Sequence, residues 1–97
     1  MPDDASQQKR HIVVEGLVQG VGFRWFARER ARRGGLSGWV QNRSDGSVEI
    51  RVSGVHETLS RFLAELAVGP KGAQVNAVRE LETELMELLP FPFQIHR

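Results

Sequence analysis

The chain has 97 residues, of which 40% are hydrophobic, a length and composition that suit one domain with a single core. It contains no cysteine, which excludes a disulfide framework and a zinc site built on thiolates. The formal net charge is only +1, which excludes a globally basic nucleic-acid binder.

The first nine residues are polar and rich in Asp, Ser and Gln, and we expect them to form a disordered tail. They offer too little apolar surface to repay the entropy of ordering. Residues 10–97 are then expected to form one domain. The opening stretch MPDDASQQKR has no apolar run, which is typical of neither a secretory signal nor a membrane span. We therefore expect a cytoplasmic protein without membrane contact.

A run of β-branched and apolar residues from Ile12 to Leu17 predicts a first strand, which ends in a glycine-spaced stretch. From Phe23 the apolar residues recur at intervals of three and four until Gly34 and Gly35, which predicts a helix. The helix carries an arginine cluster at Arg28, Arg30, Arg32 and Arg33. Such a cluster can steer anionic substrates, but we expect a solvated helix face.

Residues 36–42 and 47–53 predict two strands joined by a turn, because Asp45-Gly46 is a hairpin signal. In the second strand Val48, Ile50 and Val52 alternate with polar residues, so we expect one buried sheet face and one wet face. A second amphipathic helix follows and ends at Gly69-Pro70; its apolar face is Leu59, Phe62, Leu63 and Leu66.

The C-terminal quarter suits strand and helix about equally by local pattern. We assign a strand to residues 75–81, because the order β-α-β-β-α needs one more strand to complete a ferredoxin-like α+β sandwich. That fold is an antiparallel sheet with two helices on one face. Residues 93–96 are expected to add a short final strand after Pro90 and Pro92.

The loop Gln19–Arg24 lies between a strand end and a helix start, where unpaired backbone N–H groups and the helix dipole favour an anion. Its glycines let the backbone curl around a phosphate, and Arg24 adds a planar charged fork. The loop is neither a Walker loop nor a complete dinucleotide motif. Taken alone, glycines at this position more often serve a tight turn.

Topology strengthens the ligand interpretation, because the two strands of a β-α-β unit run parallel and end at the same edge. Asn42 should therefore lie near Arg24, although an amide at a strand end is commonly just a turn former. We expect the three histidines to lie on the surface and both tryptophans to cover the core or its rim. These residues are His11, His56, His96, Trp25 and Trp39.

Two stretches resemble the signatures of the acylphosphatase family. They are GLVQGVGFR, residues 16–24, and GWVQNRSDGSVEIRVSG, residues 38–54. The likeness extends from about His11 to Pro70, fades over residues 71–92 and resumes at the terminal Phe-x-Ile. The resemblance implies a ferredoxin-like fold and the hydrolysis of small acyl phosphates to carboxylate and inorganic phosphate, with no metal and no cofactor.

Site roles follow from the same resemblance. It implies that Arg24 and Asn42 are catalytic, with the arginine holding the phosphate and the asparagine placing a water. The implied phosphate-binding residues are Gln19, Gly20, Val21, Gly22, Phe23 and Arg24. We expect a monomer that binds neither nucleic acid nor membrane.

Two alternatives remain open at this point. An RNA-recognition module shares the element order, although the strand at residues 47–53 lacks an aromatic pair for base stacking. A non-catalytic phosphate or anion sensor would use the same loop without turnover. The chain is shorter than expected for the carbamoyl-transfer proteins that begin with such a domain.

Overall fold

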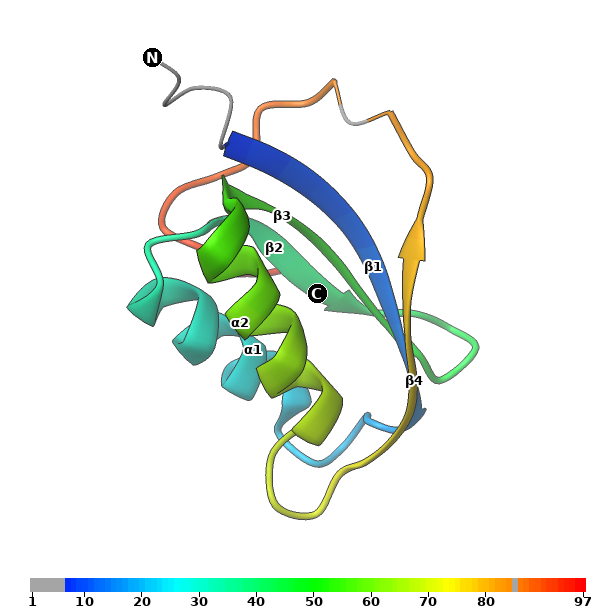
Figure 1. Ribbon diagram of the computed structural model, residues 1–97. Helices are drawn as coiled ribbons and strands as arrows, with labels where there is room; N and C mark the ends of the chain where they lie inside the picture. The colour runs from blue at the N-terminus through cyan, green and yellow to red at the C-terminus, as the bar shows by residue number, and fades with distance from the viewer. Residues whose placement is uncertain (1–6, 85) are drawn as a thin grey trace.

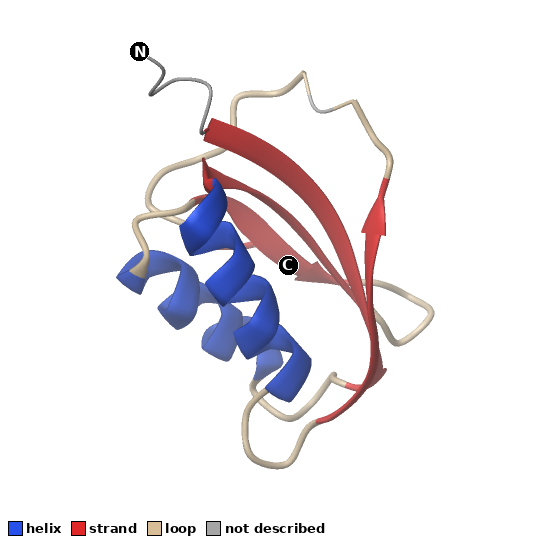
Figure 2. Cartoon of the chain, in the orientation of Figure 1, coloured by secondary structure: helices blue, strands red, loops and turns tan. Residues whose placement is uncertain are grey.

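The computed structural model describes residues 7–84 and 86–97. Its elements follow the order strand, helix, strand, strand, helix, strand, with a short last strand. They are β1 (Gln7–Leu17), α1 (Phe23–Arg33), β2 (Ser37–Asn42), β3 (Val48–Val55), α2 (His56–Val68), β4 (Gln74–Leu81) and β5 (Gln94–Ile95). Both helices lie on the same side of the sheet, as Figures 1 and 2 show. The predicted ferredoxin-like α+β sandwich is confirmed.

The sheet has the strand order β4-β1-β3-β2-β5. Its first four strands pair antiparallel, as predicted, whereas β5 pairs parallel with β2 through Trp39–Gln94 and Val40–Ile95. The sheet is therefore mixed. Strands β4 and β5 lie at opposite edges of it, so the chain crosses from one edge to the other between them (Figure 1). The strand predicted at residues 75–81 is confirmed as β4.

The core lies between the sheet and the two helices. Pairing of β1 with β3 sets Ile12 opposite Ile50 and Val14 opposite Val48, all fully buried. The helices cover these residues with Phe23, Ala27, Ala31, Leu59, Phe62 and Leu66. This packing holds the first turn of α1 next to the C-terminal end of β1. The candidate site lies at that end of the sheet.

The N-terminal part of β1 differs from the expectation. The strand begins at Gln7, so residues 7–9 of the predicted tail pair with β3, from Gln7–Val55 to Lys9–Ser53. Backbone pairing compensates for the low apolar content of this stretch. Residues 1–6 of the predicted tail lie outside the described residues. No helix in the described part of the chain has the length and apolar character needed to cross a membrane.

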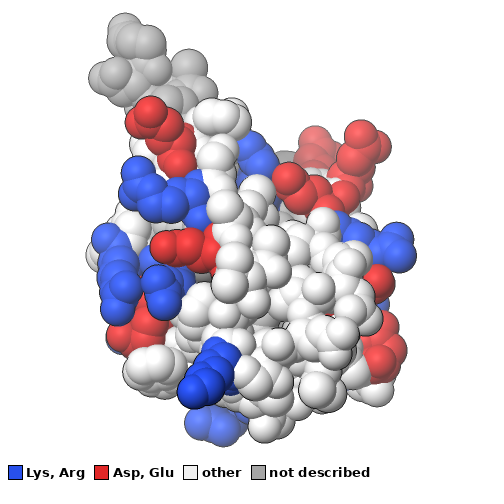
Figure 3. Space-filling view, turned by 60° about the horizontal axis from the view of Figure 1, so that its bottom comes forward, with Lys and Arg blue, Asp and Glu red and all other residues white. Residues whose placement is uncertain are grey.

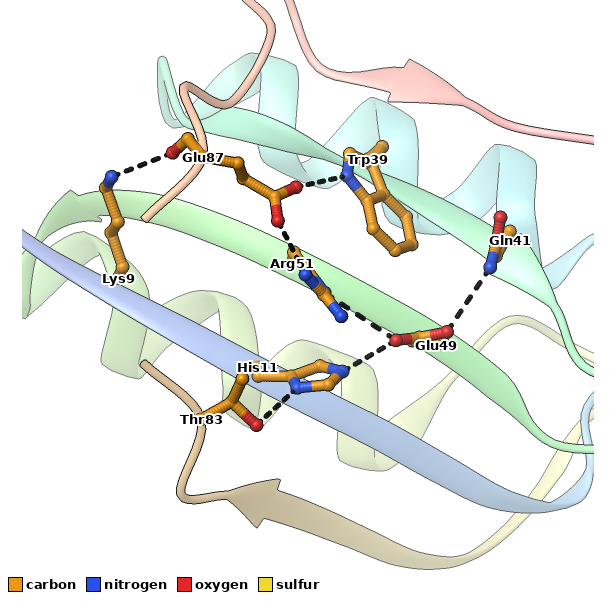
Figure 4. Close-up of polar contacts among 8 residues, drawn as sticks. All are labelled: Lys9, His11, Trp39, Gln41, Glu49, Arg51, Thr83 and Glu87. Atoms are coloured by element: carbon orange, nitrogen blue, oxygen red, sulfur yellow. Dashed lines mark hydrogen bonds and ion pairs between the residues drawn. The ribbon is translucent and has the colours of Figure 1, made fainter. Parts of the chain in front are cut away.

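The sheet face away from the helices is not simply wet, contrary to the sequence expectation. A polar network covers it, as Figure 4 shows. Glu49 is its centre and binds His11 at 2.6 Å and Gln41 at 3.3 Å. Arg51 pairs with both Glu49 and Glu87, and Glu87 accepts a hydrogen bond from the Trp39 indole at 3.2 Å.

The prediction that all three histidines lie on the surface is wrong for His11. Its side chain is only 8% exposed and lies between Glu49 and Thr83, with Nδ1 2.8 Å from the threonine hydroxyl. Thr83 comes from the segment after β4, so the burial depends on a long-range contact that local pattern does not reveal. His11 lies on the sheet face away from the helices and therefore has a structural role.

Glu87 should make the stability of the fold depend on acidic pH. Hydrogen bonding from Trp39, then pairing with Arg51, lowers the pKa of Glu87 below its ordinary value of 4.5. A lowered folded-state pKa gives stability that is present above the unfolded pKa and is lost as pH falls through the folded pKa. We expect Glu87→Gln to lower the melting temperature by a few degrees at pH 7.

The difference between wild type and Glu87→Gln should shrink as pH falls below about 4.5, because the unfolded carboxylate is protonated there first, and it should vanish below the lower folded-state pKa. Thermal melts monitored by circular dichroism at pH 7 and pH 3.5 test this. Glu82→Gln, an exposed acid just after β4, is the matched control and should have little effect. A Glu87→Gln deficit of the same size at both pH values would contradict the assignment.

Candidate active site

The loop between β1 and α1 exposes backbone N–H groups at the start of the helix. Gly20 and Gly22 have φ angles of 77° and 79°, a left-handed conformation that glycine adopts readily. Gly22 is the N-cap residue, offers no side-chain cap, and is followed by a first turn without acidic residues. The first N–H groups of α1 have no partner within the helix. This arrangement suits an anion.

Arg24 and Asn42 border one surface hollow of about 350 Å³. The loop residues Gly20, Gly22 and Phe23 border it as well. The predicted approach of Asn42 to Arg24 is therefore confirmed. Its cause is the β1-α1-β2 crossover, since both strands pair antiparallel with β3 and hence run parallel to each other.

Two residues of the predicted phosphate-binding set do not border this hollow. The Gln19 amide instead donates hydrogen bonds to the carbonyl oxygens of Arg43 and Ser47, at 2.7 and 2.9 Å. Val21 packs against the core. The side chain of Gln19 thus ties the loop to the β2–β3 hairpin, and any contribution of Gln19 and Val21 to anion binding must come from their backbone.

Asn42 is not tied into the hairpin turn. Within the described residues its side chain makes no hydrogen bond, whereas Asp45 accepts hydrogen bonds from the backbone and hydroxyl groups of Ser47. The Ser47 hydroxyl and backbone N–H hold the pKa of Asp45 below its ordinary value. Asp45 is therefore the turn former, as predicted, and the exposed Asn42 amide faces no competing partner.

The C-terminal segment completes the hollow with Ile95 and Arg97. A nitrogen of the Arg24 guanidinium lies 3.5 Å from the His96 carbonyl oxygen, a long contact that orients the side chain only weakly. The His96 ring stacks on Trp39 with centroids 5.0 Å apart. Sequence reasoning missed these site contacts, and the terminal Phe-x-Ile was the only signal that pointed to them.

Trp25 and Arg28 also border the hollow. Trp25 is 58% exposed, so the expectation that it covers the core or rim is wrong, whereas Trp39 is buried as expected. The arginine cluster on α1 is likewise not a uniformly solvated face. Besides Arg28 at the hollow, Arg32 donates a hydrogen bond to the Phe93 carbonyl oxygen at 2.9 Å.

The hollow is a local positive site. Its border includes Arg24, Arg28 and Arg97 and, within residues 7–84 and 86–97, no Asp or Glu side chain. On the face in Figure 3, Lys and Arg side chains are interspersed with Asp and Glu around a largely uncharged centre. Among residues 7–84 and 86–97, no group of three or more His, Asp or Glu side chains is placed to hold a metal ion.

These features define a class of protein, a ferredoxin-like α+β sandwich with a positively charged hollow where the first strand meets the first helix. The acylphosphatase family model matches residues 10–94. An acylphosphatase from Bifidobacterium longum is 46% identical over 78 residues, which are 80% of each chain. The structure of an acylphosphatase from Coxiella burnetii matches with a TM-score of 0.87 and 31% identity, over 99% of this chain and 100% of that one.

The chain belongs to the acylphosphatase family. It is a hydrolase that acts on acid anhydrides and cleaves small acyl phosphates to carboxylate and inorganic phosphate. The structure of HypF from T. kodakarensis matches 93% of this chain but only 12% of its own length, with a TM-score of 0.79 and 33% identity.

Proposed function

We propose that the phosphoryl group of the substrate binds in the hollow, held by the loop N–H groups and by Arg24. The observation that carries this proposal is the juxtaposition of Arg24, Asn42 and the left-handed glycines at one hollow. Arginine presents a planar fork of donors that matches phosphate oxygens. The charge on those oxygens persists or grows as the bond to the acyl oxygen loosens, so these donors stabilise the transition state.

In this proposal Asn42 orients the attacking water in line with the breaking bond. Water oxygen forms a bond to phosphorus, and the bond from phosphorus to the acyl oxygen breaks. The carboxylate that departs is a good leaving group, so positioning and electrostatic stabilisation suffice without a general acid. The water's proton passes to an oxygen of the substrate phosphate, because no Asp, Glu or His side chain among the described residues borders the hollow.

A non-catalytic anion sensor would use the same hollow, and family membership favours the enzyme. An RNA-recognition role has no support on the sheet, because Trp39, the aromatic in the network on that face, is 9% exposed and hydrogen-bonded to Glu87. The deciding experiment measures hydrolysis of an acyl phosphate beside an aryl phosphate monoester. The enzyme should cleave the first and leave the second largely intact.

Metal-independent turnover and competition by phosphate are expected together. Arginine and N–H groups supply the charge stabilisation that a metal ion would otherwise give. Activity should be unchanged after treatment with a chelator, and inorganic phosphate or sulfate should inhibit competitively with acyl phosphate. Activity lost in chelator and restored by magnesium or zinc would overturn the first expectation, and purely noncompetitive inhibition would overturn the second.

We further propose a monomer in the cytoplasm. The small net charge and the mixed surface charges in Figure 3 are compatible with a free-standing enzyme on small substrates. Sedimentation analysis of the full chain tests the monomer, and fractionation of the source cells tests the location.

A further inference from the structure

Arg28 lies next to the proposed phosphoryl site but has no role in it. It follows Arg24 by four residues on α1, a spacing that puts both side chains on one helix face with Cβ atoms about 5–6 Å apart. Both side chains border the same hollow. Arg28 is therefore placed to contact a part of the substrate beyond the phosphoryl group.

The hydrogen-bonding capacity of Arg28 is largely unused. Its Nε atom is buried and has no hydrogen-bond partner among the residues that the structure describes. One terminal nitrogen lies 3.3 Å from the Glu29 carboxylate, and the two side chains are 29% and 35% exposed. Such a solvated pair is worth little energetically, so a substrate anion can replace or supplement Glu29 as the partner of Arg28.

The charge around the hollow exceeds what one phosphoryl group needs. A phosphoryl group carries about −1.5 to −2 charges near pH 7. Three arginines and the uncapped start of α1 border the hollow, and no carboxylate side chain in the described part of the chain lies there to offset them. A substrate with a second anionic group would use this surplus.

We propose that Arg28 binds a carboxylate at the far end of the acyl group, so that the preferred substrates are acyl phosphates of short dicarboxylic acids. The guanidinium fork of Arg28 matches a carboxylate in bidentate geometry. Arg97, on the C-terminal segment, adds positive charge to the same hollow. The proposal rests on the phosphoryl group lying at Arg24, as inferred above.

The test compares succinyl phosphate with butyryl phosphate, which share a four-carbon acyl chain and differ in the terminal carboxylate. Wild type should show a higher kcat/KM for succinyl phosphate. Arg28→Gln should lower that value about tenfold or more, mainly through KM, as expected for loss of a hydrogen bond to a charged group. It should lower the value for butyryl phosphate less than threefold.

Arg33→Gln is the matched control, because it removes one positive charge from an exposed position on the same helix. It should affect both substrates weakly and equally. Arg28→Lys keeps the charge, loses the fork and should fall between wild type and Arg28→Gln. A binding measurement that needs no turnover compares the inhibition constants of 3-phosphonopropionate and propylphosphonate. The first divided by the second should rise about tenfold in Arg28→Gln, because only the first inhibitor carries a carboxylate.

Equal kcat/KM values for the two substrates in wild type would overturn the proposal. So would an Arg28→Gln variant that loses the same factor on both substrates, since Arg28 would then supply only general charge or structural support. A failure of the proposed function would give a different result in the wild-type enzyme. Butyryl phosphate would then not be hydrolysed, or inorganic phosphate would not compete with it.

Discussion

Arg24→Ala is expected to abolish most turnover and to weaken inhibition by inorganic phosphate at the same time. The guanidinium would contact the phosphoryl oxygens in both the ground state and the transition state. Loss of a hydrogen bond to a charged group costs about 1.5–3 kcal/mol, which corresponds to a loss of phosphate affinity of about ten- to a hundredfold. Turnover should fall further, by about a hundredfold or more, because charge stabilisation strengthens as the bond breaks.

Arg24→Lys separates charge from geometry. Lysine keeps the positive charge but presents a point charge in place of the planar fork, so we expect little rescue. Kinetics with an acyl phosphate and inhibition by phosphate give the two readouts, and Arg33→Ala on the same helix is the control. Because the contact of Arg24 with the His96 carbonyl oxygen is long, at 3.5 Å, the fold should survive the substitution. A folded Arg24→Lys enzyme with normal kinetics would refute the role of Arg24.

Local sequence signals sufficed to predict how Arg24 and Asn42 meet. Local patterns predict the bounds of the elements to within a few residues. The turn at Asp45-Gly46 precedes β3, the apolar alternation marks β3 itself, and Gly69-Pro70 marks the end of α2. Once the element order is known, the crossover connection makes β1 and β2 parallel and places the ends of both strands at one edge. The site geometry thus follows from topology, although Asn42 and Arg24 are far apart in sequence.

The parts that escaped prediction depend on contacts between distant segments. Strand β5 has two residues, Gln94 and Ile95, too few to show periodicity, so its parallel pairing with β2 left no local signal. The burial of His11 depends on Thr83. Gln19 faces the hairpin because the Arg43 and Ser47 carbonyl oxygens lie within reach only in the folded chain. Each of these features depends on contacts between segments that lie far apart in the sequence.

Asn42→Ala should reduce turnover and leave phosphate binding nearly intact. An amide that only orients the attacking water contributes to the transition state and not to ground-state binding of the phosphoryl group. We expect kcat to fall about a hundredfold or more, as for removal of one preorganised donor, while the inhibition constant of phosphate stays within a few-fold of wild type. This division distinguishes Asn42 from Arg24, whose loss affects both quantities.

Loss of the Asn42 side chain should affect the reaction without disturbing the fold. Within the described residues the Asn42 side chain has no hydrogen-bond partner and is exposed, so its truncation should cost little stability. Gln41→Ala is the matched control, because Gln41 precedes it on β2 and binds Glu49 at 3.3 Å on the sheet face away from the helices. Circular dichroism and a melting curve establish that each variant is folded. If folded Asn42→Ala loses phosphate affinity as severely as turnover, Asn42 holds the phosphate directly, and the proposed division of labour with Arg24 is wrong.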